Sequence, residues 1–262
     1  MSTLRTDYAA ILKLAIPVSA GTFMQFLVVL TDNFFLSRTS DAALNGAGNA
    51  GILYITLGMI GAGFCNTGQI LIARRMGEGR LRETMSILRS GLVITAVVGA
   101  LLIGTMQLLL QAGFDAVFKD AATGMEFRDF LAVRRWGFLP AFMIMMLNAY
   151  FMGTARSRIL MWAMVTTGLV NIAGDAALIT GQWGFPALGA RGAAWASFTA
   201  ECTGLCVLSG HVLYHHGREL TASAWLATEE LKRWVRLAAP MVLQLTLTLG
   251  TCLLYTSDAA DE

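Results

Sequence analysis

The chain has 262 residues, of which 56% are hydrophobic and 14% charged, with a formal net charge of +2 and a mean hydropathy of +0.61. One soluble core cannot hide this much apolar surface, so the composition indicates a membrane protein and argues against a soluble enzyme. The small net charge gives no reason to expect a nucleic-acid partner, and the four cysteines and three histidines are not spaced like metal ligands or a disulfide framework.

Seven apolar runs are long enough to cross a bilayer, whose core needs about 20 residues per helix. The first run is too long for a secretory signal, so we expect it to remain as an uncleaved span. In chain order the runs are Tyr8 to Leu36, Leu44 to Ile72, Met85 to Gly113, Phe130 to Gly153, Ile159 to Thr180, Gly192 to Tyr214, and one that begins near Leu231. The sequence therefore predicts an all-α membrane protein.

The 19 Lys and Arg residues are distributed unevenly between the two sides of these spans. With the loops assigned to alternate sides, 13 of them fall on the amino-terminal side and 6 on the other. The positive-inside rule then places the amino terminus in the cytoplasm. We therefore expect a multi-pass protein of the cell inner (cytoplasmic) membrane, with the Arg74 to Glu83 loop inside and the Asp115 to Asp129 loop outside.

A short motif of the first run returns in the seventh. Leu14-Ala15-Ile16-Pro17 is followed much later by Leu237-Ala238-Ala239-Pro240, each after a basic residue. A repeat that begins after six spans is typical of transporters with two six-helix halves. We therefore predict a six-helix lobe over residues 1–214, a connector over 215–230 and the start of a second lobe over 231–251. The connector is expected either to lie along the cytoplasmic interface or to be a solvated linker.

Residues 252–262 interrupt the seventh apolar run with an acidic tail. The string from Cys252 to Glu262 resembles the translation of a transposase-type sequencing adapter, and the alternative is a genuine acidic terminus. On the first interpretation the natural sequence ends near Thr251 and the seventh helix is truncated. Such a fragment is expected to be inactive alone, because alternating access needs both walls of the cavity.

Three segments together resemble transporters of the MATE (multidrug and toxic compound extrusion) family. They are Pro17 with Asp32, the stretch from Gly68 to Gly79, and Asn171-Ile172-Ala173-Gly174-Asp175 with the following Phe185 to Ala194. The resemblance covers essentially all of the chain from Tyr8 to Thr251. It implies a two-lobed monomer that exports organic cations or other amphipathic compounds in exchange for H⁺ or Na⁺, without a cofactor.

The resemblance also implies site residues in this lobe. The family's cation-coupling residues correspond to Asp32, Asn171 and Asp175, and a hydroxyl of its sixth helix corresponds to Ser197. Na⁺ is one ion that the first three could hold. Pro17 is expected to bend the first helix, because proline disrupts the helical hydrogen bonding.

The acids inside the spans indicate the same place without the resemblance. A charge at the centre of a span costs about 2.5–3.5 kcal/mol, so Asp32, Asp175 and Glu201 are functional candidates. Asp32, Asp175 and Ser197 each lie four or five residues from the outer end of a span, which at 1.5 Å per residue is roughly 6–8 Å below the boundary. Alternatively, an acid this close to a helix end touches only lipid headgroups.

Polar companions favour a functional site. Asn171 lies four residues before Asp175 on one helical face, and Gln25 lies seven before Asp32 on another. If these groups converge, the two carboxyl groups can share a proton, or Asn171 can offer its carbonyl oxygen to Na⁺. Glu201 either extends this acidic layer or is a structural acid that hydrogen-bonds to a neighbouring helix.

Two other functions remain as alternatives. A lipid-linked oligosaccharide flippase of the same superfamily should have a basic cavity, whereas the charges identified inside the spans are acidic. A membrane-embedded enzyme would need a nucleophile with its base, or a His-rich motif, within a span, and the runs show neither. Met143, Met145 and Met146 with Asn148 either line an adaptable substrate chamber or belong to ordinary helix contacts.

Overall fold

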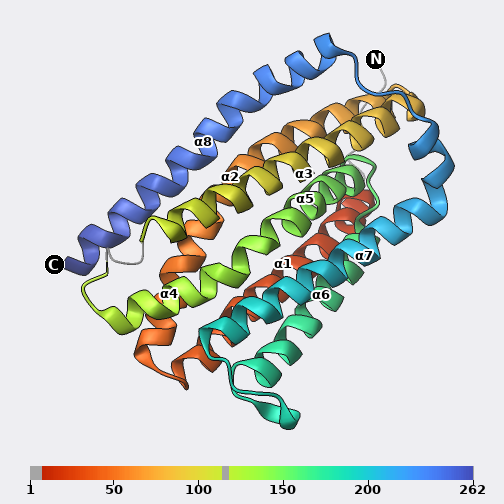
Figure 1. Ribbon diagram of the computed structural model, residues 1–262. Coiled ribbons are helices and arrows are strands. Elements are labelled where there is room, and N and C mark those ends of the chain that lie inside the picture. The colour runs from red at the N-terminus through yellow and green to blue at the C-terminus, as the bar shows by residue number, and fades with distance from the viewer. Residues whose placement is uncertain (1–7, 114–117, 262) are drawn as a thin grey trace.

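The computed structural model describes residues 8–113 and 118–261, and the regular structure of this part is helical (Figure 1). Arg5, Asp115 and Glu262, which entered the sequence predictions, lie outside the described residues. The helices are α1 (Tyr8–Ser37), α2 (Asp41–Gly77), α3 (Leu81–Gln111), α4 (Ala121–Arg134), the 3₁₀ turn η2 (Arg135–Gly137), α5 (Phe138–Gly153), α6 (Ser157–Leu178), the 3₁₀ turn η3 (Gln182–Gly184), α7 (Ala190–Ala222) and α8 (Thr228–Asp261).

Five helical segments of the described chain are long and apolar enough to cross a membrane. They are Ala15–Ser37, Asp41–Gly77, Leu81–Gln111, Ala121–Gly153 and Ser157–Leu178, and they correspond to the first five predicted spans. The sixth predicted span lies in α7, which has 33 residues but is less apolar because it includes Arg191, Glu201 and three histidines. Helix α7 lies alongside α6, so the expected all-helical membrane architecture is confirmed (Figure 1).

The fourth span begins earlier than predicted. Asp120 caps α4 by accepting hydrogen bonds from the two backbone N–H groups at 122 and 123, so the helix starts at Ala121 and continues through η2 into α5. The stretch from Ala121 to Asp129, which was expected in the outer loop, is therefore helical, and Arg134 and Arg135 lie well inside the helical segment, whereas the charge count placed both on the outer side. With both removed, the count of basic residues on that side falls from six to four. The predicted orientation thus keeps its charge bias, and it remains a prediction.

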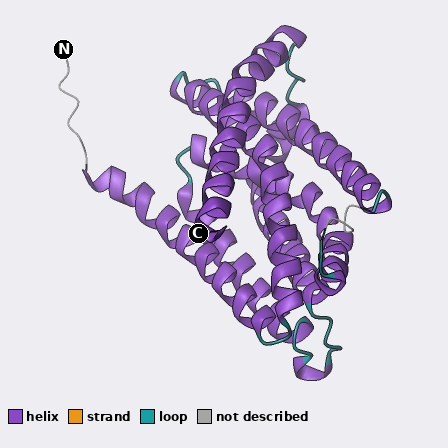
Figure 2. Ribbon diagram, turned by 90° about the vertical axis from the view of Figure 1, so that its left-hand side faces the viewer, coloured by secondary structure: helices purple, strands orange, loops and turns teal. Residues whose placement is uncertain are grey.

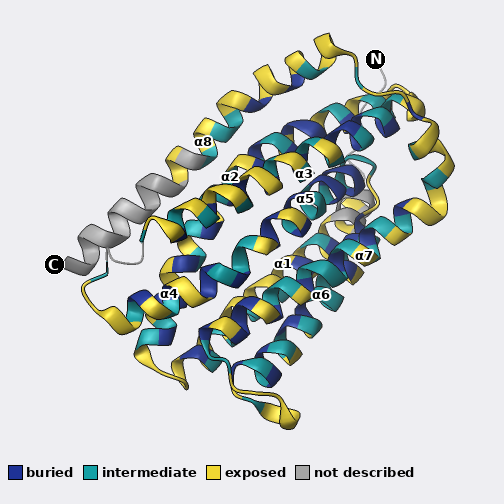
Figure 3. Ribbon diagram, viewed as in Figure 1, coloured by how far each residue is buried: buried dark blue, intermediate teal, exposed yellow. Residues whose placement is uncertain are grey.

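Buried hydrophobic residues form two clusters, one near each end of the bundle. Figure 3 marks the buried residues in dark blue along the helices. The first includes Leu36, Phe127 and Phe138 and surrounds the helix ends that are opposite the amino terminus. The second includes Met146, Tyr150 and Trp234. The polar residues of the predicted site lie between helices α1, α6 and α7, beside the first cluster.

Helix α8 packs against α2, and one aromatic side chain of α8 is buried in this contact. Trp234 is fully buried, its ring stacks on Phe64 with 4.4 Å between centroids, and its Nε1–H donates to the Phe64 carbonyl over 3.1 Å. A Cβ added at Gly68 would lie 2.6 Å from the Trp234 ring, so glycine makes room for it. Pro240 lies inside α8 as Pro17 lies inside α1, which places both copies of the repeated motif in a long helix.

The predicted connector is partly helical. Helix α7 continues to Ala222, with non-helical backbone at His216, and residues 223–227 cross to α8. Arg89 of α3 donates to the carbonyl of Ser223 over 2.5 Å, and its guanidinium lies 4.1 Å from the ring centroid of Trp225. The connector is therefore bound to α3 by a hydrogen bond and a cation–π contact. Figure 2 shows that α1, by contrast, leaves the bundle toward its N-terminal end.

Candidate functional site

Three helices bring the four sequence-predicted coupling residues together. Helix α1 packs on α6, and α6 packs on α7, so Asp32 faces Asn171 and Asp175, and Asn171 faces Ser197. The close approach of α6 and α7 depends on small residues: a Cβ on Gly174 would lie only 2.8 Å from the Cβ of Ala196. Small residues on α6 and α7 therefore let the two helix backbones approach closely.

Asn171 links the helices through its side-chain amide. With its nitrogen facing Asp32, the amide donates to Oδ1 of Asp32 over 3.1 Å, and its oxygen accepts from the backbone N–H of Ser197 over 3.3 Å. In the opposite orientation its nitrogen donates to Oγ of Ser197 over 3.3 Å. Asn171 is 2% exposed. One buried amide thus joins Asp32 of α1 to the backbone of Ser197 on α7.

The carboxyl groups of Asp32 and Asp175 contact each other. Asp175 has no exposed surface, and its Oδ1 has no hydrogen-bond partner. Within the described residues neither acid forms a salt bridge. Two carboxylates at contact distance repel each other strongly unless a proton or a cation lies between them. A proton or a cation bound between these two carboxyl groups would therefore be stabilised.

A cavity of about 280 Å³ opens beside this pair. Asp32, Asn171, Ser197 and Gln25 line it together with apolar side chains such as Val29. Asp175 is not part of the lining and lies behind Asp32. The combination of apolar walls with a few convergent polar groups is typical of small-molecule sites.

The sequence analysis missed a basic residue in the same cavity. Arg134 of α4 forms a two-pronged ion pair with Glu201 of α7, with N···O distances of 2.8 and 2.5 Å, and both side chains line the cavity. The expectation that charges inside the spans are all acidic is therefore wrong. Glu201 thus accepts hydrogen bonds from a neighbouring helix, as one of the two alternatives for it expected. The predicted span from Phe130 to Gly153 already contained Arg134, but the charge count assigned this residue to the outer side, so it was not considered among the charges inside the spans.

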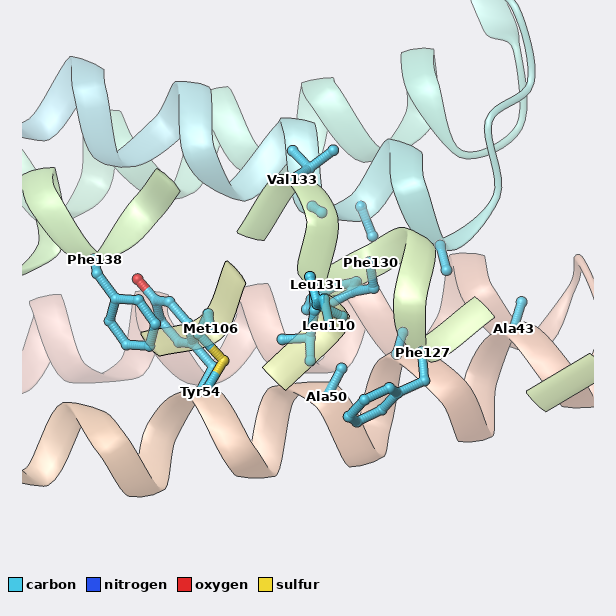
Figure 4. Close-up of a cluster of buried hydrophobic side chains, with 14 of the residues drawn as sticks. Ala43, Ala50, Tyr54, Met106, Leu110, Phe127, Phe130, Leu131, Val133 and Phe138 are labelled. Atoms are coloured by element: carbon cyan, nitrogen blue, oxygen red, sulfur yellow. The ribbon is translucent and has the colours of Figure 1, made fainter. Parts of the chain in front are cut away.

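An aromatic ring supports this ion pair from α2. The guanidinium carbon of Arg134 lies 3.8 Å from the ring centroid of Tyr54, and Tyr54 stacks on Phe138 with centroids 4.3 Å apart. Figure 4 shows the Tyr54 and Phe138 rings face to face, next to Met106. The backbone of Gly137 runs beside the pair, and an added Cβ there would lie 2.2 Å from Nη1 of Arg134 and 2.7 Å from Oε2 of Glu201. A side chain at this position would therefore force the tips of Arg134 and Glu201 to shift.

The remaining predicted residues have simpler positions. Pro17 is buried within a continuous α1, and its role as a bend remains a prediction. Met146 is fully buried in the second cluster, so for this residue the interpretation as an ordinary helix contact is confirmed.

The described residues contain no group of three His, Cys, Asp or Glu side chains that could hold a metal ion. A monovalent cation would instead depend on Asp32, the unpaired Oδ1 of Asp175 and the carbonyl oxygen of Asn171. All are oxygen donors, which suit a hard cation such as Na⁺. The same unpaired oxygen suits a proton equally well.

Solved structures share this fold. An outward-facing multidrug resistance MATE family transporter of the MOP superfamily matches with a TM-score of 0.80 and 21% identity, over 90% of this chain and 52% of that one. The inward-facing structure of a transporter described in the same words matches with a TM-score of 0.73 and 20% identity, over 92% of this chain and 55% of that one. At these low sequence identities, the structural similarity shows only that this chain shares their fold.

Related protein sequences and a family profile show to which family this chain belongs. The probable multidrug resistance protein NorM of Synechocystis is 28% identical over 78% of this chain and 44% of its own length, and that of Caulobacter vibrioides is 31% identical over 75% and 42%. The chain thus spans less than half the length of these relatives. The MatE family profile matches residues 17–176, which is more than half of the chain. This chain therefore belongs to the MATE family of membrane transporters, which are not enzymes.

Proposed function

We propose that the complete protein is a secondary antiporter of the inner membrane that exports organic cations or amphipathic drugs in exchange for H⁺ or Na⁺. This chain is its amino-terminal lobe, with the amino terminus in the cytoplasm, and α8 begins the second lobe. Asp32, Asn171, Asp175 and Ser197 form the coupling site. The single observation that supports this most is the contact between two carboxyl groups that have no salt-bridge partner in the described structure, at the edge of a cavity.

Export follows from competition for one negative charge. When Asp32 and Asp175 hold no cation, Asp32 presents its charge to the cavity and attracts a cationic drug. A proton or Na⁺ that enters from outside neutralises the pair and releases the drug. Each elementary charge that moves inward contributes about 2.3 kcal/mol per 100 mV of membrane potential, which drives the cycle.

The amide of Asn171 offers the site both a hydrogen-bond donor and an oxygen ligand. Its nitrogen donates to a charged Asp32, whereas its oxygen can bind Na⁺ together with the carboxyl oxygens. The backbone N–H of Ser197 donates to the oxygen of this amide and so holds its nitrogen toward Asp32.

The charge of the cavity favours a drug antiporter over a flippase. A flippase that binds a pyrophosphate group needs surplus positive charge, as phosphate sites generally do. Arg134 is basic, but Glu201 binds both of its terminal nitrogens. Asp32 therefore leaves the described cavity lining with surplus negative charge, which suits a cation.

The test uses the full-length protein in vesicles with an imposed gradient of H⁺ or of Na⁺, and follows efflux of a fluorescent cation at matched protein levels. Asp175→Asn keeps the volume and removes the charge, so it should insert normally and lower coupled transport by at least about tenfold. Asp32→Asn should do the same. The double variant should be hardly worse than either single one, because residues that act as a unit are not additive.

The matched control is Asp129→Asn, which changes an exposed acid on α4 and should leave transport unchanged. Comparing the two gradients identifies the coupling ion. Near-normal coupled efflux in either Asp32→Asn or Asp175→Asn would show that these acids do not couple the ion to the substrate.

A further inference from the structure

We propose that Arg134 determines the substrate charge that the cavity accepts. By occupying both carboxylate oxygens of Glu201, Arg134 limits the cavity to amphipathic cations with one positive charge. This inference rests on the proposed function, because it assumes that the cavity beside Asp32 receives the exported compound.

The first step is the geometry of the ion pair. Nη1 and Nη2 of Arg134 each bind one oxygen of Glu201, so the negative charge of Glu201 is already balanced before a ligand enters. The side chains are 12% and 17% exposed, and both face the cavity. The ring of Tyr54 covers the guanidinium, which restricts the movement of Arg134 away from its partner.

The second step is the charge of the lining. Among the described residues that line the cavity, the charged ones are Asp32, Arg134 and Glu201. Arg134 and Glu201 neutralise each other, so the lining has one surplus negative charge, at Asp32. A substrate with one positive charge is matched by it. A second positive charge on the substrate would come close to the guanidinium, and like charges at short distance oppose binding.

The third step is the separation of the two acids. Glu201 lies one turn beyond Ser197 along α7, which is about 6 Å further from the outer end of the bundle at 1.5 Å per residue. Asp32 lies near the level of Ser197, because Asn171 can contact both. Without Arg134, the cavity would therefore present two carboxylates at different depths, which is the arrangement that a dication needs.

A structural role alone does not account for this pair. Buried ion pairs are in general no more stabilising than apolar residues of similar size, because the desolvation of both charges offsets their attraction. A pair that only joined α4 to α7 would also have no reason to face a cavity. Its position beside Asp32 gives it a direct effect on the ligand.

The experiment measures equilibrium binding to the full-length protein in nanodiscs by fluorescence polarisation. The probes are ethidium and propidium, which share one aromatic ring system and carry one and two positive charges. The unaltered protein should prefer ethidium. Arg134→Gln frees Glu201 and should tighten propidium binding by at least about tenfold, with a smaller change for ethidium, because a like charge is removed and an acid gained. Glu201→Gln should weaken both probes, because the freed guanidinium opposes cations.

Two further variants separate charge from structure. Arg134→Gln with Glu201→Gln restores a neutral pair and should restore the preference for ethidium. Arg134→Lys keeps the positive charge with a different shape and should keep that preference too. Arg128→Gln, an exposed residue of the same helix, is the matched control and should change neither affinity.

An unchanged ratio of propidium to ethidium affinity in Arg134→Gln that still binds ethidium would overturn the proposal. If Arg134→Gln does not fold, the comparison of Glu201→Gln with the double variant decides: equal ratios would overturn the proposal as well. Binding needs no ion gradient, so this result is independent of coupled transport. Normal transport in Asp175→Asn together with the predicted ratio changes would reject the coupling site and retain the role of Arg134.

Discussion

The cavity has two acidic sites that differ in how their charges are balanced. On the α1 and α6 side, Asp32 and Asp175 contact each other, and one oxygen of Asp175 has no partner. On the α4 and α7 side, Glu201 has both oxygens bound by Arg134. The acids of the first site have no ion-pair partner among the described residues, and the acid of the second has one.

Under the proposed function, this difference separates an acid that works by changing its charge from an acid that keeps it. A carboxylate with a fixed guanidinium partner gains little from a mobile cation, because the cation must displace the arginine first. A carboxyl pair without such a partner binds a mobile cation directly. Burial alone therefore does not identify a coupling acid, and the partner of each carboxyl group must be known.

The largest expected effect on stability is at the balanced site. Glu201→Ala leaves the charge of Arg134 buried without its partner, which typically costs 3–5 kcal/mol, so we expect the free energy of unfolding in detergent to fall by about 4 kcal/mol. The measurement is denaturant or thermal unfolding of the purified full-length protein. A loss below about 1 kcal/mol would mean that Arg134 is solvated through the cavity and that the pair is not a fixed structural element.

Glu78→Gln is the control for this measurement. Glu78 lies in the turn after α2, exposed, and hydrogen bonds from Arg74, Arg75 and Arg80 lower its pKa from 4.5 to about 2. A lowered carboxyl pKa stabilises the fold above pH 4.5, and this contribution disappears as the pH falls toward 2. Because water screens the group, we expect no measurable change at pH 7.

A smaller effect is expected from Gly137→Ala, which disturbs the same pair without removing a charge. The new Cβ would lie 2.2 Å from Nη1 of Arg134, so the guanidinium must shift, and we expect a loss of about 1–3 kcal/mol. Gly104→Ala on α3 is the matched control, because nothing lies within 4 Å of its added Cβ. It should be neutral or slightly stabilising, since alanine favours helix. Equal unfolding midpoints for the two variants would contradict the tight fit at Gly137.

The smallest effect on stability is expected at the unbalanced site. Asp175→Asn removes a buried acid that has no salt-bridge partner in the described structure and keeps its volume, so the free energy of unfolding should change by less than about 1 kcal/mol. Its transport defect should nevertheless be severe. A loss of stability as large as that of Glu201→Ala would mean that Asp175 mainly holds the bundle together, and the contrast between the two sites would disappear.

Local sequence was sufficient to predict the membrane spans and most residues of the proposed coupling site. The length of each apolar run determines a membrane helix, because no other element satisfies the backbone in lipid. The spacing of four between Asn171 and Asp175 puts both on one helical face. Their common depth with Asp32 and Ser197 follows from counting residues from the span ends, and the structure brings all four together.

Only the tertiary structure showed which acids have partners. Arg134 and Glu201 are 67 residues apart and on different helices, so no local period relates them. Their contact depends on the rotation of α4 and α7 about their axes and on the absence of a side chain at Gly137. The sequence determined that acids lie in the membrane and at what depth, because hydrophobic length is a local property. Packing decided which of them has a fixed partner, because helix rotation is determined by contacts across the whole bundle.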